Sequence, residues 1–338
     1  MRRVRRGRGF TYLDEHGERI TESEVLERLR DLAIPPAWQD VWICPDPLGH
    51  LQATGIDSAG RKQYQYHPRW REHRDRAKYE RMVEFGEALP GLRRRLAKRI
   101  NGSEPTRDRV LACAVRLLDV GLFRIGSEEY ADDEGGIGLA TVRKEHVTVR
   151  SDAVVFDYLA KGGVRRVQAI EDPLVREILV TLRRRRGGPD ELLAYREDRR
   201  WHDVRSEDIN DSIKELLGEQ YSAKDFRTWN ASVLAAVSVA TDGRDAATKT
   251  ARKRGVDRAV RAVAQLLGNT PAVARRAYID PRIFDRYRSG WTIAPAIEQI
   301  GDLGSPDDKI RGRLEAAVID LLTDNRGSPA LEHERVAA

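Results

Sequence analysis

The hydrophobic pattern changes its period once along this chain, and that change constrains the fold more than any other feature. The first 70 residues hold short segments of alternating apolar and polar residues, separated by Gly, Pro and Asp, which is typical of β-strands. Beyond about residues 80–90 apolar residues recur at helical spacing, as they do over residues 106–122. The pattern predicts an α+β protein with a small β-rich N-terminal domain and a larger, mainly helical domain.

The same reading predicts the elements and the domain boundaries. A charged helix is expected over residues 69–98, with an interruption at Pro90-Gly91. A small three-stranded sheet is expected inside the helical part, with its last two strands joined by a tight turn at Ala160-Lys-Gly-Gly163. The predicted strands are residues 10–13, 19–20, 40–44, 50–56 and 61–67 in the first domain, and 147–149, 153–158 and 164–170 in the second. The predicted domains are residues 1–85, 86–300 and an amphipathic, acidic C-terminal tail, 301–338.

Composition narrows the function classes. The chain has 60 Lys+Arg against 54 Asp+Glu, a formal net charge of +6, and only ten of the 60 are lysine, which leaves 50 arginines. Arginine binds phosphate through two parallel hydrogen bonds, although many of these residues could simply cover the surface. The longest nearly uncharged apolar run, residues 232–241, is about half of the roughly 20 residues that a membrane span needs. We expect neither a secretion signal after the basic N-terminus nor a membrane partner, and the two cysteines have no metal-ligand spacing.

Five residues of the helical part form a candidate constellation. Arg124 lies between two glycines after an apolar helix, Lys161 lies at the tip of the predicted hairpin, and Arg227 lies near a helix start. Asn269 lies in Gly-Asn-Thr-Pro, which ends one helix and begins another, and Tyr278 follows nine residues later. Such a set suits metal-free phosphoryl transfer, because guanidinium groups can bind the charge that builds up on non-bridging oxygens, a tyrosine can attack and a lysine can protonate the leaving oxygen.

Two of these arginines have a plainer alternative, which is ordinary ion pairing at the surface. Arg124 could pair with Glu128 or Glu129, and Arg227 could pair with Asp225. Spacing alone does not decide between the two interpretations, because a chain with 50 arginines offers many such sets.

Longer segments around these residues resemble one known family. Over roughly residues 10–290 the chain resembles the bacterial and poxvirus-like type IB DNA topoisomerases. In the helical part the resemblance rests on Phe-Arg-Ile-Gly around Arg124, Lys-Asp-Phe-Arg-Thr-Trp around Arg227, and Gly-Asn-Thr-Pro followed by Arg-Arg-Ala-Tyr. In the N-terminal part it rests on Ile-Pro-Pro-Ala-Trp at 34–38, His-Leu-Gln-Ala-Thr-Gly at 50–55 and Gly-Arg-Lys-Gln-Tyr at 60–64.

The resemblance implies a role for each of the five residues. Tyr278 would attack the phosphodiester and form a DNA-(3′-phosphotyrosyl) bond, releasing a 5′-hydroxyl. Arg124 and Arg227 would bind the non-bridging oxygens, and Lys161 would be the general acid for the 5′ oxygen. Asn269 stands where poxvirus members have His; it can donate a neutral hydrogen bond but carries no charge. Because the covalent link conserves the energy of the broken bond, the resemblance implies relaxation of positive and negative supercoils, followed by religation, without ATP, metal or other cofactor.

The resemblance also implies how the protein meets its DNA. Gln63, Tyr64 and Tyr66 match positions at which the family's N-terminal domain contacts duplex DNA, and strand alternation places the two tyrosines on one face with Gln63 opposite or at the edge. The implied architecture is a two-domain clamp with a tyrosine recombinase-like catalytic core. The implied protein is monomeric and cytoplasmic, associated with the nucleoid through DNA.

Two other functions remain open from the residues themselves. A tyrosine recombinase or integrase uses the same Arg, Lys, Arg and Tyr chemistry, but such enzymes generally have His-x-x-Arg around the second arginine, where this chain has Lys224. A non-catalytic protein that only binds duplex DNA is the second alternative, and complete retention of the catalytic set argues against it.

Overall fold

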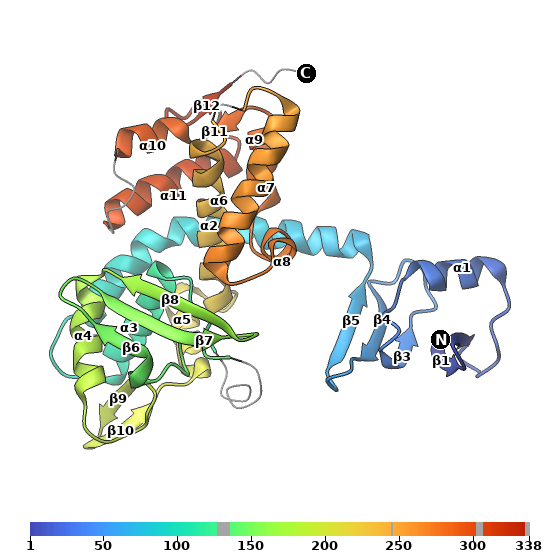
Figure 1. Ribbon diagram of the computed structural model, residues 1–338, viewed down its shortest axis with the longest axis horizontal. Helices are drawn as coiled ribbons and strands as arrows, with labels where there is room; N and C mark the ends of the chain where they lie inside the picture. Colours follow the sequence, from blue (N-terminus) through green and yellow to red (C-terminus); the bar gives the residue numbers. More distant parts are fainter. Residues whose placement is uncertain (127–135, 245, 302–306, 335–338) are drawn as a thin grey trace. The chain divides into compact units, whose positions relative to one another are not determined.

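The computed structural model describes residues 1–126, 136–244, 246–301 and 307–334, and the chain divides into two compact units. The N-terminal unit is Met1–Glu80 and the C-terminal unit is Arg81–Ala338. One helix, α2 (Pro68–Ile100), belongs to both (Figure 1). The predicted class, α+β with a small N-terminal sheet domain and a mainly helical core, is confirmed; the boundaries predicted at 85/86 and 300/301 stay predictions.

The N-terminal unit is a five-stranded antiparallel sheet in the order β2-β1-β3-β4-β5, with one helix. Its apolar core includes Leu29 of the helix and Ile43 of the sheet, both buried. The arrangement is local, because every sequence neighbour except β2 and β3 pairs within the sheet. The elements are β1 (Arg2–Arg6), β2 (Gly9–Leu13), α1 (Ser23–Asp31), β3 (Gln39–Ile43), β4 (Leu51–Ile56) and β5 (Lys62–Tyr66).

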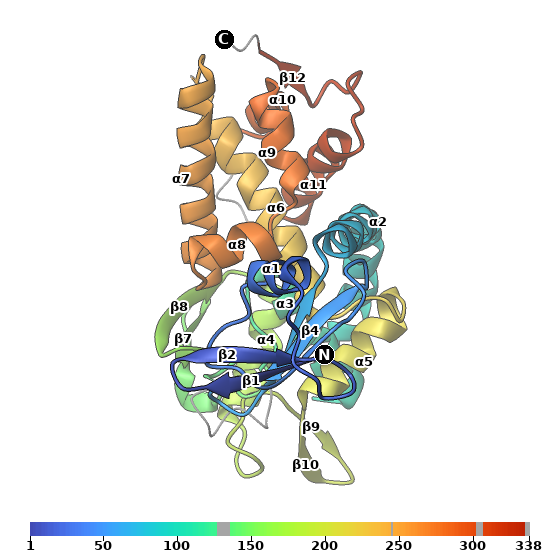
Figure 2. The same ribbon diagram turned by 90° about the vertical axis from the view of Figure 1, so that its right-hand side faces the viewer.

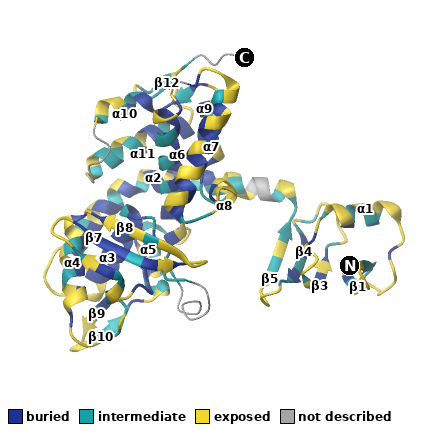
Figure 3. Ribbon diagram, in the orientation of Figure 1, coloured by how far each residue is buried: buried dark blue, intermediate teal, exposed yellow. Residues whose placement is uncertain are grey.

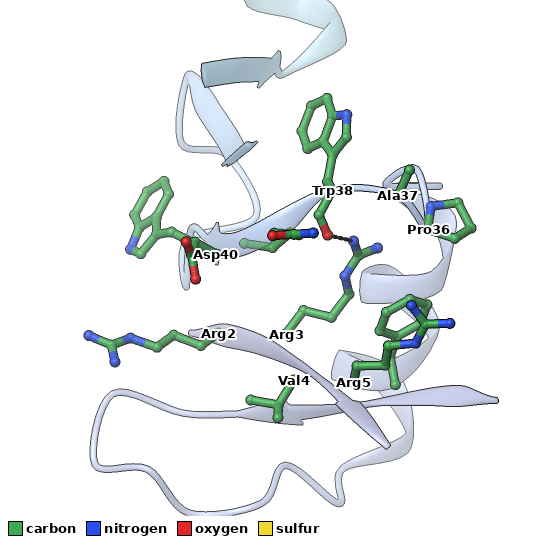
Figure 4. A pocket seen from close by; sticks show the side chains of 12 residues that line it. Arg2, Arg3, Val4, Arg5, Pro36, Ala37, Trp38 and Asp40 are labelled. Carbon is green, nitrogen blue, oxygen red and sulfur yellow. Dashed lines mark hydrogen bonds between the residues drawn. The ribbon is translucent and has the colours of Figure 1, made fainter. Parts of the chain in front are cut away.

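Strand β1 is an element that the sequence pattern does not predict, because four of its five residues are arginine. Arg3 explains its place in the sheet. Its guanidinium is buried and donates hydrogen bonds to the carbonyls of Ile34 (2.8 Å), Pro35 (2.9 Å) and Trp38 (2.9 Å). Figure 4 shows Arg3 reaching toward the segment that holds Trp38. Residues 19–20, where a strand is expected, form only an isolated bridge from Arg19 to Leu13.

The C-terminal unit is mainly helical and contains the predicted three-stranded sheet, in the order β6-β7-β8. Helix α6 lies along α7, and Figures 1 and 2 both show the two helices side by side. Figure 3 shows the buried residues that run along α6. The strands of this unit are β6 (Val147–Val149), β7 (Val154–Ala160), β8 (Val164–Ile170), the hairpin β9 (Ala194–Glu197) and β10 (Arg200–Asp203), which was not predicted, and β11 (Trp291–Thr292) and β12 (Glu332–His333). Its helices after α2 are α3 (Arg107–Val120), α4 (Pro173–Arg184), α5 (Ser206–Leu217), α6 (Ala223–Thr241), α7 (Lys249–Leu267), α8 (Pro271–Ala277), α9 (Pro281–Arg288), α10 (Ala294–Ile300) and α11 (Asp308–Leu322).

The prediction that the helix is interrupted at Pro90-Gly91 is wrong, because α2 continues through Pro90 to Ile100. A proline inside a helix removes one backbone hydrogen bond and crowds the preceding turn. Tertiary packing compensates here. Leu89 and Leu92 are buried, and one turn before the proline Gly86 packs so closely on the ring of Trp229 that a Cβ would lie 2.4 Å from it.

Helix α11, in the segment expected to be a tail, packs on α6, α9 and α10. It also supplies Glu315 to a buried ion-pair cluster around Asp119. Arg93 donates to both carboxylate oxygens of Asp119 (2.9 Å each) and to both of Glu315 (2.7 Å each). Arg116 and Arg311 also donate to Asp119, at 2.8 Å and 2.8–3.2 Å. The cluster therefore joins α2, α3 and α11 in the interior of the C-terminal unit.

This cluster predicts that the C-terminal unit loses stability in acid. Burial alone would raise the pKa of Asp119, but the charges of Arg311, Arg93 and Arg116 outweigh it and hold the pKa well below its ordinary value of 3.8. A depressed carboxyl pKa contributes stability that is complete above the unfolded-state value and is lost as the pH falls below it. We expect this group alone to cost the folded state at most about 1.4 kcal/mol per pH unit, a slope that is approached as the pH falls below the unfolded-state pKa.

Urea unfolding at pH 7, 4 and 3 measures this loss. An Asp119→Asn variant should be less stable than the unsubstituted protein at pH 7 but should lose less stability between pH 4 and pH 3. An equal loss in both proteins would contradict the assignment.

Candidate active site

The C-terminus of α7 brings two of the predicted arginines together. Helices end with unsatisfied backbone carbonyls, and α7 ends at Gly268, which has the left-handed conformation (φ 62°, ψ 44°) that glycine adopts at little cost. Arg227 of α6 donates to the carbonyls of Leu267 (2.9 Å) and Leu122. Arg124 donates to the carbonyl of Gly268 (2.9 Å) and to Oδ1 of Asn269. Three of the five predicted residues therefore meet at one helix end.

Tyr278 joins this cluster from the end of α8. The guanidinium of Arg227 lies over the Tyr278 ring, 5.2 Å from its centroid. The sequence builds this position locally, because Thr270 caps α8 and Pro271 occupies its first turn, as predicted. The backbone N–H of Tyr278 donates to the carbonyl of Ala274 (3.1 Å) and thereby closes the helix. The half-buried phenol thus lies beside the arginine pair.

The arginines favour ionisation of the Tyr278 phenol. Burial acts to raise the pKa of Tyr278, but the charges of Arg227 and Arg124, a hydrogen bond from Arg227 and the charge of Lys224 outweigh it, and the net pKa is lowered. A second tyrosine near the same charges behaves differently. Tyr158 of β7 is 3% exposed, and burial raises its pKa despite the neighbouring Arg166, Arg227 and Arg124. Of these two tyrosines, Tyr278 is the one whose phenol ionises more readily.

Donor groups at the site lack partners. Burial lowers the pKa of Arg227 to about 10, so the side chain stays charged at neutral pH. Among the residues that the structure describes, no carboxylate pairs with Arg227 or Arg124, and the buried Nε of Arg227 and Nδ2 of Asn269 have no hydrogen-bond partner. Unpaired buried donors are unfavourable unless a ligand satisfies them. A site rich in positive charge and free N–H groups can bind an anion such as phosphate.

The structure tests only one of the two ordinary ion pairs that the sequence allows for these arginines, the pair of Arg227 with Asp225. Asp225 accepts hydrogen bonds from the N–H (2.8 Å) and hydroxyl (3.0 Å) of Ser222, where it caps α6, and not from Arg227. The pairing of Arg124 with Glu128 or Glu129 lies outside the described residues.

Lys161 is not brought to the cluster. It lies in the turn between β7 and β8, as predicted, and its side chain is exposed. In the described parts of the chain it forms no hydrogen bond or ion pair with Arg124, Arg227 or Tyr278. The backbone of Gly136 lies so close to this turn that a Cβ on Gly136 would be 2.1 Å from the backbone nitrogen of Lys161. The hairpin turn is therefore supported by backbone contact, while the lysine side chain is exposed.

The sequence names Lys224 only as a departure from the recombinase pattern, and the structure adds it to the charged residues near Tyr278. Lys224 lies one helical turn before Arg227 on α6, and its charge helps to lower the pKa of Tyr278. The i, i+3 spacing of the two residues was visible in the sequence, but the capped helix start that places them both near Tyr278 was needed to interpret it.

One face of the N-terminal sheet carries two of the predicted contact residues. The rings of Tyr64 and Tyr66 stack at 6.3 Å, and Tyr66 stacks on Trp70 at 4.5 Å. Tyr64 is 50% exposed. The side chain of Gln63 lies on the opposite face of the strand, where its amide donates a hydrogen bond to Asp57 (2.8 Å). The tyrosines thus form an accessible aromatic surface, and Gln63 is engaged within the unit.

Strand register extends that face beyond the predicted residues. Arg2 pairs with Trp42, Trp42 with Thr54 and Thr54 with Tyr64, so the four residues form one row across β1, β3, β4 and β5. Trp42 is 38% exposed, a large apolar side chain at the surface. A row of exposed aromatic and basic side chains is typical of nucleic-acid-binding sheets. Trp42 was not predicted, because its place in the row depends on a register irregularity in β3.

Comparison with known proteins places the chain among DNA topoisomerases. A family model described as the catalytic core of eukaryotic DNA topoisomerase I matches residues 67–291, and one described as the N-terminal domain of bacterial DNA topoisomerase IB matches residues 9–57. DNA topoisomerase 1B of Acanthamoeba polyphaga mimivirus is 27% identical over 285 residues, which cover 82% of this chain and 84% of the relative. DNA topoisomerase 1B of vaccinia virus (strain Copenhagen) is 21% identical over 270 residues, 78% of this chain and 82% of the relative. DNA topoisomerase 1 of Schizosaccharomyces pombe is 31% identical over 160 residues, 47% of this chain but 19% of the relative.

Within the described residues no group of three or more His, Cys, Asp or Glu side chains is placed to hold a metal ion. No described helix is both long and apolar enough to cross a membrane.

Proposed function

The chain belongs to the type IB DNA topoisomerase family, and on that premise we propose that it relaxes supercoiled DNA through a covalent bond between Tyr278 and a 3′-phosphate. The observation that carries the proposal is the position of Tyr278 beside two arginines that have no carboxylate partner among the described residues, with its phenol pKa lowered by their charge. A phenol next to guanidinium and amide donors that can bind an anion is the arrangement that a phosphodiester substrate requires.

The proposed reaction balances without any added reagent. The Tyr278 phenol gives up its proton to solvent, its oxygen attacks phosphorus and forms the phosphotyrosyl bond, and the bond from phosphorus to the 5′ oxygen breaks. Lys161 gives that oxygen its proton and takes one back from solvent. Arg124, Arg227 and the free amide of Asn269 hold the non-bridging oxygens, whose charge increases in the transition state. After the nicked strand has swivelled, the 5′-hydroxyl attacks phosphorus and the steps run in reverse.

The finer expectations from the sequence belong to the same proposal. We propose that residues 86–300 form a tyrosine recombinase-like core, that this core and the N-terminal domain close as a clamp around duplex DNA, and that Tyr64 and Tyr66 contact the duplex. The enzyme is proposed to act as a monomer in the cytoplasm, at the nucleoid, without ATP or an obligatory metal. Gln63 remains in the proposed DNA contact, reached by exchanging its hydrogen bond to Asp57 for a base edge.

Relaxation of a supercoiled plasmid in EDTA, without nucleotide, tests the function. Plasmids of positive and of negative superhelicity should both yield relaxed topoisomers. Stopping the reaction with detergent should leave protein bound at a 3′ end and a free 5′-hydroxyl that polynucleotide kinase labels. No relaxation, or protein bound at the 5′ end, would contradict the proposal.

Lys161 has its own test, because a general acid is needed only when the leaving group needs a proton. Lys161→Ala should slow cleavage of an ordinary duplex by roughly 10²–10⁴-fold. A duplex with sulfur in place of the 5′ bridging oxygen should restore the rate, since a thiolate leaves without protonation. Arg165→Ala, four residues along the same hairpin, is the control and should behave like the unsubstituted enzyme on both duplexes. Equal slowing of Lys161→Ala on both duplexes would exclude the acid role.

A further inference from the structure

A third arginine, Arg166 of β8, also lies at the C-terminus of α7. Its Nη1 donates to the carbonyl of Leu266 (2.7 Å), and its Nη2 donates to Oε1 of Gln168 (3.1 Å). The consecutive carbonyls of Leu266, Leu267 and Gly268 thus accept hydrogen bonds from Arg166, Arg227 and Arg124 respectively. One helix end holds three guanidinium groups, each through a different carbonyl.

The charge balance of this group is unusual. No carboxylate in the described residues pairs with Arg166, as with the other two arginines, and the charges of Arg124 and Arg166 both oppose protonation of Arg227. Neighbouring Arg165 differs: it points to the other face of the strand, is exposed, and is paired with Asp157 at 2.6–2.8 Å. The C-terminus of α7 carries a partial negative charge of about half an elementary charge, which offsets only a small part of the charge of the three cations.

The three arginines have different freedom to meet a phosphate. In the proposed mechanism Arg124 and Arg227 divide their donors between protein carbonyls and the non-bridging oxygens. Arg166 has both terminal nitrogens engaged by protein atoms, and its Nε is buried. The bond from Arg166 to Leu266 ties the last turn of α7 to the sheet and is not shared with the phosphate.

We propose that Arg166 is a positioning residue for strand cleavage, which holds the last turn of α7 so that Arg124, Arg227 and Asn269 keep one arrangement around the phosphate. The inference rests on the proposed function. It predicts an effect on the rate of the chemical step rather than on DNA affinity.

Single-turnover cleavage of a duplex whose cleaved strand loses a short 3′ fragment measures that rate. Arg166→Ala should slow formation of the covalent adduct by roughly 10–100-fold, the range expected for losing a hydrogen bond to a charged group. DNA affinity should change less than about threefold on the same grounds. Arg166→Lys should recover part of the rate, because an ammonium group can still donate to the Leu266 carbonyl. Arg165→Ala is the matched control and should keep the rate of the unsubstituted enzyme.

Two readouts separate positioning from simple loss of folded protein. Misfolding lowers the final amount of adduct but not the rate constant of the active fraction, whereas positioning lowers the rate constant. Asn269→Ala provides a double-mutant cycle: because Arg166 acts through the turn that carries Asn269, the double variant should be faster than the product of the two single effects predicts.

The outcomes distinguish the two proposals. If neither the unsubstituted enzyme nor Arg165→Ala forms an adduct, the proposed function fails and the inference fails with it. If both form the adduct and Arg166→Ala does so at the same rate constant, or if its effect and that of Asn269→Ala simply multiply, only the role of Arg166 is overturned.

Discussion

Tyr278→Phe should abolish plasmid relaxation and leave DNA binding intact. The substitution removes only the hydroxyl oxygen that would bond to phosphorus, while the ring that lies under Arg227 is preserved. Tyr158, a second tyrosine near these arginines, is buried, and burial raises its pKa. Loss of a nucleophile that forms a covalent intermediate reduces rates by on the order of 10⁴-fold or more. Relaxation at stoichiometric enzyme and gel detection of the adduct measure the effect.

Tyr158→Phe is the matched control for this prediction. It removes a hydroxyl close to the same three arginines but from a side chain that keeps its proton. We expect it to relax DNA within about tenfold of the unsubstituted enzyme, since one hydrogen bond is lost at most. The assignment of Tyr278 as the nucleophile would be contradicted if Tyr278→Phe formed the adduct, or if Tyr158→Phe alone failed to form it.

Arg227→Ala should slow cleavage by roughly 10²–10³-fold, the usual effect of removing one donor that binds transition-state charge. The side chain is 3% exposed and reaches Leu267, Leu122 and the Tyr278 ring at once, so its loss removes both charge and positioning. Arg227→Lys should recover little, because one ammonium group cannot reproduce the planar fork of donors. Arg288→Ala, which removes an exposed arginine paired with Asp285, is the control.

The loss of the Arg227 charge should also shift the pH dependence of cleavage in a known direction. The charge of Arg227 has the largest effect among those that lower the pKa of Tyr278, so the Tyr278 phenol of the Arg227→Ala variant should ionise at higher pH. If ionised tyrosine is the attacking form, the rising limb of the rate against pH should move to higher pH in this variant and stay in place in Arg288→Ala. A rate profile that falls by the same factor at every pH would show that Arg227 contributes only through phosphate binding.

Much of the site was predictable because its signals are local. The glycine, threonine and proline at 268, 270 and 271 end one helix and start the next as expected, which places Asn269 and Tyr278. The hairpin that carries Lys161 was equally predictable from its flanking strand patterns and paired glycines. The roles of these residues followed from the family resemblance and remain proposals.

Other features depended on contacts between distant segments. Helix α2 passes through Pro90 because packing on Trp229, far away in the chain, outweighs the local cost of the proline. Strand β1 forms because Arg3 satisfies carbonyls more than 30 residues away. No local pattern reports either contact.

By itself, the sequence determined the candidate side chains for phosphoryl transfer, their order along the chain and the caps that fix their helices. The tertiary structure alone decided which arginines of the described residues pair with a carboxylate and which meet at the end of α7. The physical reason is that charge pairing, burial and pKa are set by neighbours in space. Arg165 and Arg166 are adjacent in the sequence, yet strand alternation gives one an aspartate at the surface and the other a helix end in the catalytic unit.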